Sequence, residues 1–135
     1  MNLVERLVQA DIKKALELKR KTIKSSRLAE ILGEEEPVEI EIKEIPQRKL
    51  NDIMAMQYSS NGKFQISQSF DAKLMSLVEG VENPSLRDKN LQNHFHAESP
   101  KKLAEILFGS EVTKISDEIL AISGVSEDDE EEVKN

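Results

Sequence analysis

The side chains that could perform chemistry in this chain are few, and their spacing does not favour a reaction. His94 and His96 are the only histidines, and Glu98 is the one further candidate metal ligand beside them. Zinc sites usually need three or four protein ligands. The histidine pair therefore predicts a role at a helix end or on the surface, and we expect no bound metal.

Other catalytic arrangements are not indicated either. The chain has no cysteine, which excludes disulfides and thiolate nucleophiles. No serine lies in a Gly-x-Ser-x-Gly turn, and two histidines leave few bases for a catalytic triad. Carboxylates are so numerous that any acid and base pair lacks specificity, and the five glycines are isolated, without a phosphate-binding loop. We therefore expect a protein that is not an enzyme and takes no cofactor.

Charge is segregated along the chain. The net charge is −7, of which residues 127–135 contribute −5, whereas residues 13–24 sum to +5. The basic segment has no aromatic side chains for stacking on bases, so a solvated basic helix is favoured over nucleic-acid contact. The start of the chain lacks the pattern of a signal peptide, and no apolar run approaches the ~20 residues needed to span a membrane. These features predict a cytoplasmic protein.

The length of 135 residues predicts one domain. With four Phe, one Tyr and no Trp, its core must be mainly aliphatic. We expect an N-terminal helix and basic arm over residues 1–25, a single globular and mostly helical domain over residues 26–125, and a disordered acidic tail over residues 126–135.

Apolar spacing predicts the elements of that domain. Val38, Ile40 and Ile42 alternate with charged residues, so Pro37–Ile45 is predicted to be a strand that is covered on one face. A second short strand is possible over Lys63–Ser67, although a loop fits nearly as well. The helical periods fall in segments near residues 27–32, 47–58, 69–80, 85–95, 100–108 and 112–122. The predicted fold class is α+β, predominantly helical, with several short helices packed with a small two-stranded β element.

The first 24 residues allow two interpretations. Leu3, Val4, Leu7 and Val8 form a short amphipathic helical stripe, which Ile12 and later apolar residues prolong only weakly. This segment is either a helix that frays into a solvated linker or an arm that folds on a partner.

An ordered set of packing and turn residues runs through nearly the whole chain. It includes Met1–Leu7, the Ile40–Ile45 strand leading into Leu50–Met56, Gly80-Val81, Pro84–Lys89, Leu91, Phe95, Ser99-Pro100, Leu103, Ile106-Leu107, Gly109, Glu111-Val112, Ile115, Asp117–Ile119, Ser123-Gly124 and Glu131–Asn135. In this order the set resembles the XkdN-like family of phage tail assembly chaperones, found in prophages and defective prophage elements of Gram-positive bacteria. Phe108-Gly109-Ser110-Glu111 departs from the Pro-Gly-Glu expected there, but it keeps the Gly and the Glu.

The resemblance implies a function without catalysis. Such chaperones bind the tape measure protein, hold it soluble and extended, help to recruit tail tube subunits, and are absent from the finished tail. The expected partners are therefore the phage tape measure protein, the tail tube protein and a second copy of the chain, with neither membrane nor nucleic acid. The expected location is the cytoplasm of the bacterial host cell. The family often makes a second, longer product by translational frameshift.

A chaperone for a helical client needs apolar grooves in which an amphipathic helix can lie. We therefore expect the contacts on the helices of the C-terminal half, with the N-terminal arm as the second choice. The predicted contact residues are Leu86, Leu91, Phe95, Leu103, Leu107, Ile115 and Ile119. Full burial of the first three in the folded monomer would remove most of the support for this site.

Two other functions remain as alternatives. The first is a structural or adaptor component that stays in a phage tail-like particle. The second is a small nucleic-acid-associated regulator that uses the Lys13–Lys24 basic segment, whose retention on DNA would be sensitive to salt.

Overall fold

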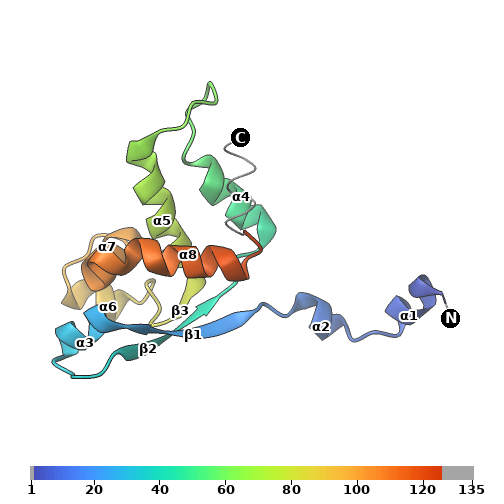
Figure 1. Ribbon diagram of the computed structural model, residues 1–135, viewed down its shortest axis with the longest axis horizontal. Helices are drawn as coiled ribbons and strands as arrows, with labels where there is room; N and C mark the ends of the chain where they lie inside the picture. The colour runs from blue at the N-terminus through green and yellow to red at the C-terminus, as the bar shows by residue number, and fades with distance from the viewer. Residues whose placement is uncertain (1, 126–135) are drawn as a thin grey trace.

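A computed structural model describes residues 2–125 of the chain, and the predicted acidic tail lies outside the described residues. Its elements form an α+β fold (Figure 1). In chain order they are α1 (Leu3–Val8), α2 (Ile12–Leu16), β1 (Arg20–Ser25), α3 (Ser26–Leu32), β2 (Val38–Lys43), α4 (Gln47–Ala55), α5 (Ile66–Gly80), β3 (Val81–Asn83), α6 (Lys89–His94), α7 (Pro100–Phe108), the 3-10 turn η1 (Gly109–Glu111) and α8 (Val112–Ile122).

The sheet has three antiparallel strands in the order β1-β2-β3. In β2, Ile40 and Ile42 are buried, and the alternating charged residues face the other way. The predicted one-sided strand is therefore confirmed, because apolar side chains at every second position all point to the core.

The prediction of a two-stranded element is wrong in the number of strands and in the segment expected to be the second strand. Lys63–Ser67 is not a strand: Phe64 makes only an isolated bridge with Tyr58, and α5 already begins at Ile66. The true partners of β2 are β1 and β3. The first has one apolar residue, Ile23, among polar ones, and the second is three residues long, so neither carries a strand pattern of its own.

The core lies between this sheet and the helices on its buried face (Figure 1). Helix α5 contacts α4, α7 and α8, and α8 also contacts β2. The most closely packed point is Gly80, where a Cβ atom would lie 2.5 Å from Cγ2 of Ile119. Glycine at the end of α5 thus allows α8 to approach its backbone.

Several helices begin at a residue whose side chain caps the helix. Ser25 accepts a hydrogen bond from the backbone N–H of Leu28, and Ser99 accepts one from that of Lys102. These serine oxygens satisfy N–H groups that have no partner within the helix. The segment predicted as a helix from Ser85 is shorter than expected, because α6 begins only at Lys89, after its N-cap Asp88.

The N-terminal arm is also shorter than predicted. Residues 20–25 pair along their whole length with β2, so they belong to the sheet. Helices α1 and α2 have no buried residue and extend away from the body of the molecule (Figure 1).

Candidate partner-binding surface

Most of the predicted contact residues lie inside the folded domain. Each of these is at most 3% exposed and belongs to the hydrophobic core; they are Leu86, Leu103, Leu107, Ile115 and Ile119. Leu91 and Phe95 are half-buried and pack against that core. The five core residues therefore have no surface to offer a client in this conformation.

The apolar stripes of α7 and α8 are covered because both helices pack against α5. A periodic stripe shows which face of a helix is apolar, but it does not show whether the protein itself covers that face. Whether an apolar face is covered depends on contacts between segments far apart in the sequence, and a helical period carries no information about those contacts.

Leu91 keeps some accessibility at the side of α6. It lines an open hollow of about 390 Å³ together with Asn83, Pro84, Ser85, Asp88, Asn90 and His94. Leu91 and Pro84 supply its apolar surface, and the other five residues surround them with hydrogen-bonding groups. Next to it, the ring of Phe95 meets the His94 ring edge to face, with centroids 4.9 Å apart.

Among the described residues, the arm carries the longest series of exposed apolar side chains. Six aliphatic side chains there are 62–80% exposed, and we call them the arm surface: Leu3, Val4, Leu7, Val8, Ile12 and Leu16. Isolated exposed apolar residues are ordinary, whereas six on one short segment, with none buried in its two helices, favour a role in binding. These residues belong to the N-terminal arm, the second choice for the contact surface from the sequence.

Both arm helices have well-formed N-terminal caps. The side chain of Asn2 accepts a hydrogen bond of 2.9 Å from the N–H of Glu5, and that of Asp11 accepts one of 2.9 Å from the N–H of Lys13. Helices of six and five residues are nevertheless too short to be stable in water by themselves. Their stability must rise when their apolar faces are covered.

A second apolar group lies at the end of the α4–α5 hairpin, which projects from the body (Figure 1). Tyr58, Phe64, Ile66 and Phe70 are all exposed there. The rings of Tyr58 and Phe64 meet edge to face, with centroids 5.8 Å apart. We call these four residues the hairpin tip.

Beneath the tip, α4, α5 and α8 enclose a small cleft of about 180 Å³. Ile53, Met54, Ala72 and Leu120 supply its apolar lining, and Lys73 and Asp117 contribute charge. Ligand pockets typically measure about 300–1,000 Å³, so the cleft matches one or two partner side chains better than a small-molecule substrate.

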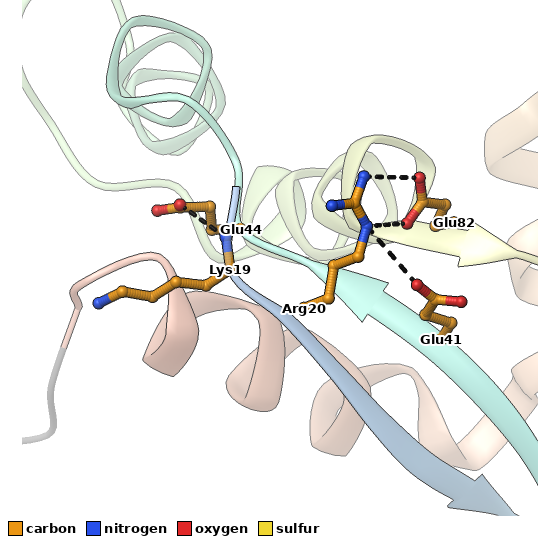
Figure 2. Close-up of polar contacts among 5 residues, drawn as sticks. All are labelled: Lys19, Arg20, Glu41, Glu44 and Glu82. Carbon is orange, nitrogen blue, oxygen red and sulfur yellow. Dashed lines mark hydrogen bonds and ion pairs between the residues drawn. The ribbon is translucent and has the colours of Figure 1, made fainter. Parts of the chain in front are cut away.

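Part of the predicted basic segment is neutralised on the sheet (Figure 2). Nε of Arg20 lies 2.7 Å from Oε2 of Glu82 and 3.5 Å from Oε1 of Glu41, so one guanidinium joins all three strands. Nζ of Lys21 lies 2.7 Å from Oε2 of Glu118 on α8. The hydrogen bond from Arg20, aided by the charge of its guanidinium, lowers the pKa of Glu82, and the same contact raises the pKa of Arg20.

The described residues contain no cluster of three or more His, Asp or Glu side chains that could hold a metal ion. His94 ends α6, and His96 lies two residues beyond it with a positive φ of 54°. Within residues 2–125, no helix is both long and apolar enough to cross a membrane. The exposed features that remain are the surfaces described above, which suit binding to another protein.

Comparison with known proteins agrees with this picture of a binding protein. The sequence model of the phage XkdN-like tail assembly chaperone family matches residues 4–135, nearly the whole chain. The chain belongs to this family. The resemblance seen in the sequence is thus confirmed, and the family is a chaperone family, a non-catalytic kind of protein.

One solved structure supports the fold of this family member. The crystal structure of the protein yqbn aligns with a TM-score of 0.57 at 13% sequence identity, over 82% of this chain and 90% of that one. At such low identity the likeness concerns the fold alone. No curated protein sequence matches the chain significantly.

Proposed function

We propose that this chain is a phage tail assembly chaperone that binds the tape measure protein, keeps it soluble and assists assembly of the tail tube. Membership of the XkdN-like family supports the general role. The single observation that carries the binding role is the arm surface, six exposed aliphatic side chains on two helices without a buried residue.

Binding to the arm has a clear physical basis. Leu3 and Leu7 are four residues apart on one face of α1, as are Val4 and Val8, which suits contact with an apolar helix of the client. Covering these side chains removes apolar area from water and stabilises helices that are marginal alone. The arm would therefore cover apolar surface of the client and keep it soluble, and the client would in turn stabilise the two arm helices.

The contact residues predicted in the C-terminal half take a secondary place in this proposal. Leu91 and Phe95 are partly accessible and could extend the contact. The four buried leucines and isoleucines of α7 and α8 would become available only if one of these helices opened, and Leu86 only if the segment between β3 and α6 moved; either change requires loss of core packing.

The proposed partners and location follow from the chaperone role. The partners are the tape measure protein first and the tail tube protein second. Action would take place in the cytoplasm of a bacterial host that carries the phage or prophage, and the chaperone would leave before the tail is complete.

Co-expression with the large helical protein encoded nearest downstream tests the proposal. We expect a soluble complex, with that client insoluble when it is expressed alone. The double substitution Leu3→Ser and Leu7→Ser should return the client to the insoluble fraction, because it removes both leucines from one face of α1.

Leu32→Ser is the matched control for this experiment. Leu32 on α3 is 60% exposed, close to the 63% of Leu7, but it lies outside the arm surface, so the complex should survive. No complex with a client that is soluble by itself would overturn the proposal. Recovery of the chain in purified particles would instead favour a structural or adaptor protein.

A further inference from the structure

A small hollow lies between α3 and the loop that follows it, and we call it the acidic hollow. It measures about 180 Å³ and is lined by Ser26, Ala29, Glu30, Glu34, Glu35 and Pro37. Ala29 and Pro37 supply its apolar surface, and the glutamates surround them. This volume is below the range of small-molecule sites, about 300–1,000 Å³. It suits a single side chain with an aliphatic stem and a positive end, as in lysine.

The surroundings of the acidic hollow strengthen its preference for a cation. Residues 30–39 include five glutamates and no lysine or arginine, and every residue from 30 to 37 is exposed. Among residues 2–125, no basic group lies within 4.0 Å of the carboxylates of Glu30, Glu34 or Glu35. A cation that enters the hollow is therefore attracted by several carboxylates at once.

The arm carries side chains of the complementary kind. Three exposed lysines there have no carboxylate within 4.0 Å among the described residues, and we call them the arm lysines: Lys13, Lys14 and Lys19. Lys14 is two residues from both Ile12 and Leu16, which at 3.6 residues per turn places it on the opposite side of α2. A lysine of α2 can therefore be bound while the arm surface stays available to a client.

The arm and the acidic hollow of one molecule lie at opposite ends of β1. The arm enters this strand at Arg20, whereas α3 begins at Ser26, directly after the strand. A strand of six residues spans roughly 20 Å, and α1 and α2 extend away from the body on the side opposite α3 (Figure 1). Each molecule thus presents a basic projection at one end and an acidic hollow at the other.

We propose that the arm lysines of one copy bind the acidic hollow of a second copy of the chain. Charge complementarity identifies the partner, because the chain itself supplies both halves of the contact and directs them away from each other (Figure 1). The two surfaces differ, so the contact is heterologous and builds a ring if its rotation closes or a row of copies if it does not. Exposed ion pairs are individually weak, so the association is reversible and sensitive to salt.

The inference does not rest on the proposed function, and sedimentation velocity of the full chain tests it without a client. At low salt the mean sedimentation coefficient should rise with protein concentration. It should return to the monomer value in 0.5 M NaCl, where the Debye length falls to about 4 Å. The arm variant, Lys13→Glu with Lys14→Glu, should lose the association. The hollow variant, with Glu30, Glu34 and Glu35 each replaced by Lys, should lose it too.

Two further samples make the test specific. An equimolar mixture of the arm variant and the hollow variant should associate again, because an acidic arm now meets a basic hollow. Lys63→Glu with Lys114→Glu should keep the association, because both lysines are exposed and lie outside the arm, although the net charge changes as much as in the arm variant. A parent chain that stays monomeric at low salt, an association lost equally in this control, or a mixture that stays monomeric would overturn the proposal.

Discussion

Gly80 at the end of α5 lies directly against Ile119 of α8, and no larger residue fits between them. A Cβ atom at position 80 would lie 2.5 Å from Cγ2 and 2.8 Å from Cδ1 of Ile119, which is itself fully buried. Because both helices belong to the core, the contact cannot relax by moving a side chain into solvent. This close approach fixes how α8 sits on α5.

Gly80→Ala should therefore destabilise the protein by about 1–3 kcal/mol, the usual cost of overpacking a core. The gain in helix propensity of alanine over glycine, about 0.5–1 kcal/mol, offsets only part of this cost. Urea unfolding followed by circular dichroism measures the difference. Ile119→Ala removes all the opposing atoms, so adding Gly80→Ala to that variant should cost nothing further. Equal stability of Gly80→Ala and the parent would contradict the packing described here.

Glu111 caps α3 from a distant part of the chain, and its removal should be costly. Its carboxylate accepts hydrogen bonds from Oγ of Ser25 at 2.5 Å and from the N–H of Ser26 at 3.1 Å, at the N-terminus of α3. Glu111→Ala should lower the free energy of unfolding by about 1–3 kcal/mol, because donors near the core lose their acceptor. Denaturant unfolding provides the measurement.

Glu105→Ala is the control for the cap. Glu105 on α7 is exposed and its carboxylate pairs with Lys102 on the same helix, at 3.3 Å, so the change should stay within about 0.5 kcal/mol. If Glu111→Ala lowered the free energy of unfolding no more than Glu105→Ala does, the cap would contribute nothing to stability.

The Arg20–Glu82 pair should make a small part of the stability depend on pH. The pKa of Glu82 in the folded chain lies below the ordinary 4.5, so the unfolded chain binds this proton more readily. The contribution of the pair to the free energy of unfolding is fully present above pH 4.5. It is lost as the pH falls through the lower pKa that Glu82 has in the folded chain. Both side chains are partly exposed, which limits the size of the effect through solvent screening.

Glu82→Gln tests this dependence directly. The difference in melting temperature between the parent and Glu82→Gln should be largest near neutral pH and should shrink below pH 4.5. An NMR titration of the Glu82 carboxyl should give a midpoint below the ordinary value. A midpoint at or above 4.5 would contradict the pairing.

Truncation to alanine should destabilise the protein strongly at a buried apolar residue and very little at an exposed one. Leu107 is 3% exposed in the core and Leu7 is 63% exposed on the arm. Leu107→Ala should cost about 2–5 kcal/mol, and Leu7→Ala should change stability by less than about 0.5 kcal/mol. Thermal and urea unfolding of both variants give the comparison; a large loss for Leu7→Ala would mean that the arm packs on the body.

Local sequence patterns predicted the elements whose signals are internal to a short segment. The alternation in Val38–Lys43 predicted β2, and the helical spacing after Val112 predicted α8 with its true end at Ile122. The sequence did not predict the strand β1, because its residues are polar and basic apart from Ile23. It is a strand because β2 presents a complementary row to it, with Lys24 opposite Glu39 and Ile23 opposite Ile40.

The sequence by itself determined the family, the α+β class, the aliphatic nature of the core and the segregation of charge. Only the tertiary structure decided which apolar faces are covered. Ile119 and Leu7 both lie on apolar helical stripes, yet the first is buried against Gly80 and the second remains in solvent. The reason is that periodicity is a property of neighbouring residues, whereas burial depends on contacts between segments that are distant in the chain.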